Sequence, residues 1–198
     1  MLQKFVKGKV YVFIDAANIL YSQRTLGWRV DYQKLKEYLK KECDLKGLYF
    51  YTGKIGKDHK QKRFLEKMVN YGYQVKSKEV KMIKVGTNVY ERKGDLDAEL
   101  IIDALKNIDN FDTCILMSGD SDFASLVDEL KAKDKWVIVI STRGHISKEL
   151  LDRAKYIDLR KLKSELIFVK KNLEHPEGSP EVRLLLDYQT HKPLSRDS

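Results

Sequence analysis

The sequence predicts a doubly wound α/β fold, in which a mainly parallel sheet carries helices on both faces. Short runs rich in β-branched and aromatic residues alternate along the chain with amphipathic segments, which is the pattern of repeated βα units. The central β-type runs are apolar throughout, as expected for strands that are covered on both faces. With 198 residues, the chain is long enough for one good core and an appendage.

Six segments have the composition of strands. They are residues 9–15 (KVYVFID), 46–53 (KGLYFYTG), 73–80 (YQVKSKEV), 113–119 (TCILMSG), 135–141 (KWVIVIS) and 156–159 (YIDL). The alternation is interrupted at residues 80–93, VKMIKVGTNVYERK, where GTN stands between two β-prone runs. This interruption predicts a hairpin or an extended excursion before the next helix.

Four segments between these strands have the i, i+3, i+4 spacing of helices with one apolar face. The apolar positions are Tyr32, Leu35, Tyr38 and Leu39; Phe64, Leu65, Met68 and Val69; Leu100, Ile101, Ala104, Leu105 and Ile108; and Phe123, Leu126, Val127 and Leu130.

We expect one domain over residues 1–171 and a tail over residues 172–198, because NLEHPEGSP is rich in breakers and only one short apolar run follows it. The tail is either a frayed end or a short helix for dimerisation or docking of a protein partner. No apolar run approaches the roughly 20 residues that span a bilayer, and the start has no signal-peptide core, so a cytoplasmic protein is expected. Cys43 and Cys114 are expected to be reduced packing residues.

Carboxylates follow two strands that a doubly wound sheet places side by side. Asp15 ends the first strand, and Asp120 and Asp122 follow the fourth within SGDSD. In the common doubly wound order these strands are neighbours at the switch point, so their acids meet at one edge of the sheet.

Asp97 is a third source of negative charge. On a helical wheel of about 100° per residue it falls in the middle of the apolar stripe of its helix, whereas Asp95 is better placed as an N-cap and Asp103 lies off the stripe. A carboxylate that faces the sheet is costly to desolvate unless it is paired, capped or bound to a cation.

Two explanations of these acids remain open. Each Asp after a strand is, taken alone, a common helix cap. Capping explains the set poorly, however, because it needs one acceptor per helix and SGDSD supplies four in five residues. Crowded carboxylates favour a hard divalent cation, Mg²⁺ or Mn²⁺, and Mg²⁺ held in this way usually also binds a phosphate-bearing substrate.

These segments resemble the NYN domain, the LabA-like branch of the PIN-like nuclease superfamily. The matching pieces are FIDAANI (13–19), KGDLDAELIIDAL (93–105), ILMSGDSDFASLVDEL (115–130) and ISKELLDRAKYIDL (146–159). The resemblance implies a Rossmann-like fold and a metal-dependent endoribonuclease that leaves a 5′-phosphate and a 3′-hydroxyl. Its acidic metal site would fall on Asp15, Asp97, Asp120 and Asp122, with Asn18 and Ser118 as polar neighbours and Asp103 as a further matching carboxylate. A homodimer is a further expectation, by analogy only.

The net charge of +9 is concentrated beside these motifs, since residues 54–93 hold twelve Lys or Arg and four Asp or Glu. With an RNA substrate, these cations are expected to follow the phosphate backbone. The candidates are Lys54, Lys57, Lys60, Lys62, Arg63, Lys81, Lys84, Arg92 and Lys93, with Arg143 and His145 at the rim. The interleaved Tyr51, Tyr71, Tyr73 and Tyr90 are expected to be half-buried packing residues rather than stacking platforms for bases.

Two other functions fit the same fold. One is a non-catalytic module that binds RNA or protein, against which the presence of all four acids argues. The other is a Mg²⁺-dependent phosphatase, because GDSD alone resembles other acidic metal motifs, although the chain lacks a G-x-x-x-x-G-K-[ST] phosphate loop.

Overall fold

The computed structural model describes residues 1–169, apart from 55, 57, 87 and 88, and only the backbone between 82 and 93. The predicted tail and Lys57 therefore lie outside the described parts of the chain, as do the side chains of Lys84, Tyr90, Arg92 and Lys93.

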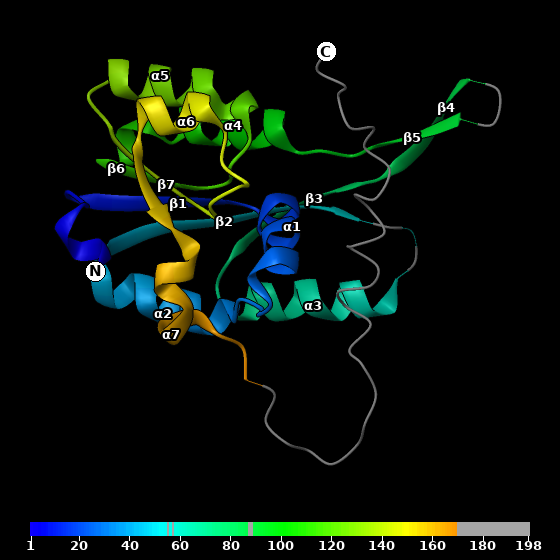
Figure 1. The fold of residues 1–198 in the computed structure, drawn as a ribbon, viewed down its shortest axis with the longest axis horizontal. Helices are drawn as coiled ribbons and strands as arrows, with labels where there is room; N and C mark the ends of the chain where they lie inside the picture. Colours follow the sequence, from blue (N-terminus) through cyan, green and yellow to red (C-terminus); the bar gives the residue numbers. More distant parts are fainter. Residues whose placement is uncertain (55, 57, 87–88, 170–198) are drawn as a thin grey trace.

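Six parallel strands form the central sheet, in the order β3-β2-β1-β6-β7-β8 (Figure 1). The strands are β1 (Lys9–Asp15), β2 (Asp44–Lys54), β3 (Gln74–Glu79), β6 (Thr113–Met117), β7 (Trp136–Ser141) and β8 (Lys155–Asp158). They are the six strands that the sequence predicts, so the α/β fold class is confirmed. The chain order reverses between β1 and β6, which is the switch point where sheets of this type bind ligands.

A separate two-stranded antiparallel sheet interrupts the alternation, as predicted. It consists of β4 (Lys81–Gly86) and β5 (Val89–Lys93), which follow β3 directly along the chain. This hairpin projects beyond the main sheet and leads back to α4 (Figure 1).

Helices cover both faces of the sheet. On one face lie α4 (Asp97–Lys106), α5 (Ala124–Ala132) and α6 (Lys148–Arg153); on the other lie α2 (Tyr32–Glu42), α3 (His59–Asn70) and α7 (Lys163–Leu166) (Figure 1). α1 (Ala16–Leu26) follows β1 at the carboxyl end of the strand. Short 3-10 turns are η1 (Leu2–Lys4), η2 (Ile108–Asn110), η3 (Ser121–Phe123) and η4 (Leu159–Leu162).

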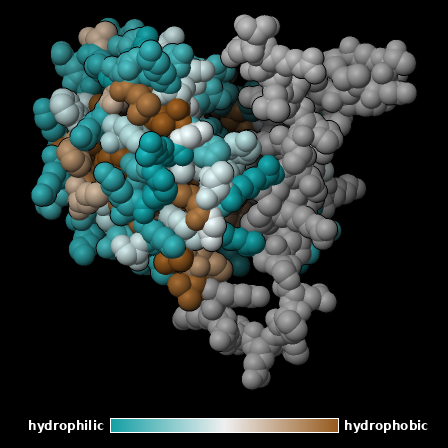
Figure 2. Space-filling view, in the orientation of Figure 1, coloured by the Kyte–Doolittle hydropathy of each residue, from teal (hydrophilic) through white to brown (hydrophobic). Residues whose placement is uncertain are grey.

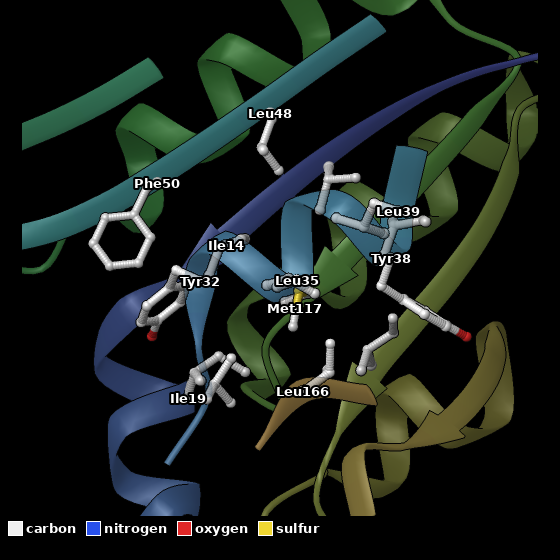
Figure 3. Packing of buried hydrophobic residues seen from close by; sticks show 14 of the residues in the cluster. Ile14, Ile19, Tyr32, Leu35, Tyr38, Leu39, Leu48, Phe50, Met117 and Leu166 are labelled. Atoms are coloured by element: carbon white, nitrogen blue, oxygen red, sulfur yellow. The ribbon is translucent and has the colours of Figure 1, made fainter. Parts of the chain in front are cut away.

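The core consists of two layers, one on each side of the sheet. β1 contributes to both because successive side chains of a strand point to opposite faces: Val12 and Ile14 join the layer under α2, whereas Phe13 joins the layer under α4 and α5. Figure 3 shows Ile14 and Met117 from the sheet beside Leu35 from α2. Complete burial of one such side chain is worth about 1.5–3 kcal/mol.

Two residues that the helical patterns assign to apolar faces are exposed. Val69 of α3 has 56% of its surface accessible and Leu105 of α4 has 38%. Both lie at the margin of their stripe, since the buried positions of α3 are Gln61, Leu65 and Met68, and those of α4 are Leu100 and Ala104. The side of the molecule seen in Figure 2 is mostly hydrophilic with scattered hydrophobic residues.

Both cysteines are free thiols, as expected: Cys114 is buried in β6, and half-buried Cys43 donates its thiol to the carbonyl of Leu39. Among the described helices, none has the length and apolar character that crossing a bilayer requires.

Candidate metal centre

Three carboxylates from two distant segments converge beyond the carboxyl ends of the central strands. Asp97 is the first residue of α4, and Asp120 and Asp122 follow β6. One oxygen from each lies within 4.8 Å of the other two. Asp97 and Asp120 are half-buried and Asp122 is exposed, so the group is open to solvent on one side.

Asp15 lies beside this group at the end of β1, the strand that pairs with β6. Its Oδ1 accepts hydrogen bonds from the backbone N–H groups of Ala17 (3.0 Å) and Asn18 (3.2 Å), so Asp15 also caps α1. Its Oδ2 accepts a hydrogen bond of 2.9 Å from the Ser118 hydroxyl. Burial raises the pKa of Asp15, hydrogen bonds from Asn18 and Ser118 oppose the rise, and the charge of Asp120 adds to it.

Ser118 connects Asp15 to the loop that carries the other acids. Its hydroxyl is fully buried, donates to Asp15, and accepts a hydrogen bond of 3.3 Å from the backbone N–H of Asp120. Asp120 Oδ1 in turn accepts from the backbone N–H of Asp122 at 3.1 Å. The helix-cap explanation therefore holds in part, because Asp15 caps α1 and Asp120 caps η3. Each of these two carboxylates also has a second oxygen that makes no capping bond.

The raised pKa of Asp97 shows that negative charge on its carboxylate is unfavourable at this position. Burial, followed by the charges of Asp15, Asp120, Asp95 and Asp122, raises the pKa of Asp97 to about 7. Among the described side chains, none forms a salt bridge to Asp97, Asp120 or Asp122. Such a donor set of carboxylate oxygens, without His or Cys, suits a hard divalent cation such as Mg²⁺ or Mn²⁺.

Asp95 does not cap α4, contrary to the sequence-based expectation. The helix begins at Asp97, its N-cap position is Leu96, and Asp95 is exposed. Asp97 and Glu99 in the first turn supply the negative charge that a helix N-terminus favours.

Asp103, the further carboxylate that matches the family pattern, is not part of the acidic group. Its Oδ2 accepts a hydrogen bond of 2.9 Å from the Tyr51 hydroxyl, and Lys76 Nζ lies 3.7 Å away. Asp103 therefore joins α4 to β2, and burial together with this bond raises the pKa of Tyr51.

Asn18 lies in the first turn of α1, where its side-chain oxygen is buried and has no hydrogen-bond partner among the described residues. An unpaired buried amide oxygen costs about 1–3 kcal/mol, so a hydrogen-bond donor at this position would be stabilising.

The predicted RNA-binding cations that the structure describes are exposed. They are Lys54, Lys60, Lys62, Arg63, Lys81 and Arg143. Lys54 ends β2 and Arg143 follows β7, so both lie at the carboxyl edge of the sheet, as do the acids. Tyr51 and Tyr73 are buried and Tyr71 is half-buried, which confirms the packing interpretation for these three tyrosines.

Gly119 is a site residue that the sequence reasoning missed. A Cβ on Gly119 would lie 1.7 Å from the carbonyl oxygen of His145 and 2.7 Å from Ser141 Oγ. The Gly119 carbonyl also accepts a hydrogen bond of 2.9 Å from the backbone N–H of Ser147. Only glycine lets the acidic loop, residues 118–122, pack against the loop that follows β7. The one feature of the sequence that could have pointed to Gly119 is its position inside SGDSD.

A family model for the NYN domain matches residues 9–160, which is the span from β1 to the end of the central sheet. The chain belongs to the NYN domain family. This NYN domain is 33% identical over 178 residues to Low amplitude and bright protein LabA of Synechococcus elongatus, covering 87% of the chain and 93% of LabA. It also superposes on the crystal structure of a protein of unknown function from Vibrio parahaemolyticus with a TM-score of 0.67 and 26% identity, covering 81% of the chain and 97% of that protein.

The NYN family is nuclease-like as a family, and the similarity to LabA agrees with the LabA-like resemblance of the sequence motifs. The matched span contains all four acids at the switch point.

Proposed function

We propose that this NYN domain is a metal-dependent endoribonuclease that hydrolyses internal phosphodiester bonds of RNA. The observation that carries the proposal is the group of three carboxylate oxygens within 4.8 Å of one another, with no compensating salt bridge among the described side chains. Membership of a nuclease-like family supports it independently.

Asp97, Asp120 and Asp122 would hold Mg²⁺ or Mn²⁺, and Asp15 would add negative charge from β1. When bound, such a cation supplies Lewis-acid activation of water and stabilises the charge that develops on the phosphate.

The protein residues position these groups and the substrate. Ser118 is unavailable as a nucleophile because it is buried and donates its proton to Asp15, so the attacking group is water. Exposed lysines and arginines such as Lys54 and Arg143 at the carboxyl edge supply positive charge that attracts the phosphate backbone. The side-chain oxygen of Asn18 would accept a hydrogen bond from a water or from a substrate hydroxyl, and this bond would offset the cost of burying the oxygen.

The deciding experiment offers the purified protein an internally labelled single-stranded RNA, DNA of the same sequence, and a small phosphate monoester. We expect internal RNA cleavage with Mn²⁺ or Mg²⁺, products with 5′-phosphate and 3′-hydroxyl ends, and no cleavage in excess EDTA. Release of phosphate from the monoester without RNA cleavage would favour a phosphatase. Tight RNA binding without cleavage under any metal condition would favour a non-catalytic module, and cleavage that survives EDTA would remove the metal from the proposal.

A further inference from the structure

A polar face of α1 runs away from the acidic group. Asn18, Ser22 and Thr25 are spaced i, i+4 and i+7, so they lie along one side of the helix, which begins at the Asp15 cap. Ser22 is fully buried, and its hydroxyl has no hydrogen-bond partner among the described residues. A buried serine is unusual on a helix that packs against a sheet, because the buried side normally presents an apolar stripe.

The loop after β7 contacts this face at Thr25 and connects it to the loop that carries Asp120. Thr25 Oγ1 lies 2.8 Å from His145 Nε2, and the backbone N–H of His145 donates to the Thr142 carbonyl at 2.8 Å. The His145 carbonyl packs against Gly119, the residue before Asp120. His145 therefore joins the far end of α1, through its ring, to the loop that carries Asp120, through its backbone.

The hydrogen bonds determine which nitrogen of His145 is free. The Thr25 hydroxyl has one proton and donates it to the Ser22 carbonyl at 3.0 Å, so it accepts from His145 Nε2–H. In the neutral ring Nδ1 is then an acceptor. Burial lowers the pKa of His145, which favours the neutral ring at physiological pH.

An exposed aromatic ring stands beside the imidazole ring of His145. Tyr21, on α1, has 42% of its surface accessible, and its ring meets that of His145 edge to face at a centroid distance of 4.9 Å. The Arg24 guanidinium carbon lies 5.6 Å from the Tyr21 ring centroid. An exposed aromatic ring and a hydrogen-bond acceptor held in position match the face and the edge of an unpaired nucleobase.

We propose that Tyr21 and His145 form a subsite for one unpaired nucleobase of the RNA. Tyr21 stacks on the base, and His145 Nδ1 accepts a hydrogen bond from an amino or imino group of the base edge. The identity of the ligand rests on the proposed function, whereas the place of the subsite rests on the contacts of α1 with the loop after β7. The proposal also predicts that the substrate is single-stranded at this position, because a base in a duplex cannot stack on Tyr21.

The test measures binding of a short single-stranded RNA that carries one fluorescent 2-aminopurine, without divalent ions so that no cleavage occurs. For Tyr21→Ala we expect an affinity about 5-fold to 100-fold weaker and loss of the 2-aminopurine quenching, since stacking on an aromatic side chain is worth about 1–3 kcal/mol per base. Tyr21→Phe and Tyr21→Trp should restore both. His145→Ala should weaken binding about 2-fold to 10-fold, the effect of one hydrogen bond.

Trp136 provides a matched control. Its surface is 41% accessible and Lys7 Nζ lies 4.2 Å from its ring centroid, but it begins β7 and so lies at the opposite edge of the sheet from the acids. Trp136→Ala should leave binding and quenching unchanged. Equal effects of Tyr21→Ala and Trp136→Ala, or no effect of Tyr21→Ala, would overturn the subsite.

The two proposals fail in different ways. If the protein binds RNA through Tyr21 but never cleaves it with Mn²⁺, the nuclease proposal fails and the subsite stands. If it cleaves RNA and the Tyr21→Ala variant retains its KM and its affinity, only the subsite fails.

Discussion

Replacing Asp120 by Asn is expected to reduce Mn²⁺-dependent RNA cleavage more than about a hundredfold. Loss of a residue that only supports a metal ligand typically costs 10–100-fold, and Asp120 contributes an oxygen to the acidic group directly. The fold should survive because an Asn oxygen can still accept the Asp122 backbone N–H, and Asn is as good a cap as Asp. Initial cleavage rates, with circular dichroism as a check of folding, measure this effect.

Asp103→Asn is the matched control for Asp120→Asn. Asp103 lies on α4, the helix that carries Asp97, but its carboxylate binds the Tyr51 hydroxyl, and an Asn oxygen can also accept that bond. We expect cleavage within a few-fold of wild type. A folded Asp120→Asn variant that cleaves RNA at the wild-type rate would contradict the assignment of the acidic group.

Gly119→Ala is expected to lower the free energy of unfolding by about 3 kcal/mol. The added Cβ would lie 1.7 Å from a backbone oxygen that cannot rotate away, so one of the two loops must move. Overpacking typically costs about 1–3 kcal/mol, and the shift would also break the Ser147–Gly119 backbone hydrogen bond, worth about 1 kcal/mol. Because the same loop holds Asp120, RNA cleavage should fall as well.

Denaturant unfolding measures the effect of Gly119→Ala. Ser121→Ala, in the same loop at an exposed position, is the control and should change stability by less than about 0.5 kcal/mol. A Gly119→Ala variant as stable as wild type would show that the two loops do not pack as closely as the structure has them.

Much of the fold could be predicted because the hydrophobic periodicity of the sequence indicates which segments form strands and helices. Strands such as β6, in which every residue is buried, and helices such as α2, with one clear apolar face, have unambiguous patterns. The pattern of α1 is weaker because its buried positions are Ala16, Ile19 and Ser22, so a buried serine interrupts the apolar stripe. Val69 shows the opposite error, since an apolar residue can lie at the margin of a stripe and remain exposed.

The sequence could place the acids but not their neighbours. The strand order brings Asp15 and Asp120 to one edge of the sheet, and the helical periodicity places Asp97 on the side of its helix that faces the sheet. The convergence of these segments therefore follows from local sequence patterns and topology. The bond of Asp103 to Tyr51 and the packing of Gly119 against His145 depend on contacts between elements far apart along the chain. Periodicity carries no information about such contacts.

The central claim is that Asp97, Asp120 and Asp122 form a site whose charge requires a divalent cation. The pKa of Asp97 in the folded protein, about 7, lies above its ordinary value of 3.8, so without metal the folded state loses stability as the pH rises through this range. The loss is absent below about pH 4, where Asp97 is protonated in both states.

Thermal unfolding of wild type and Asp97→Asn, in EDTA and in Mn²⁺ at about pH 7.5, tests this claim most directly. In EDTA, Asp97→Asn should raise the free energy of unfolding by roughly 1 kcal/mol, a value discounted for the partial exposure of Asp97, and Tm by about 2–4 °C. In Mn²⁺ at about 100 times its Kd, wild type should gain about 2.7 kcal/mol and the variant much less. Equal stabilisation of both proteins by Mn²⁺, or none of wild type, would contradict the account.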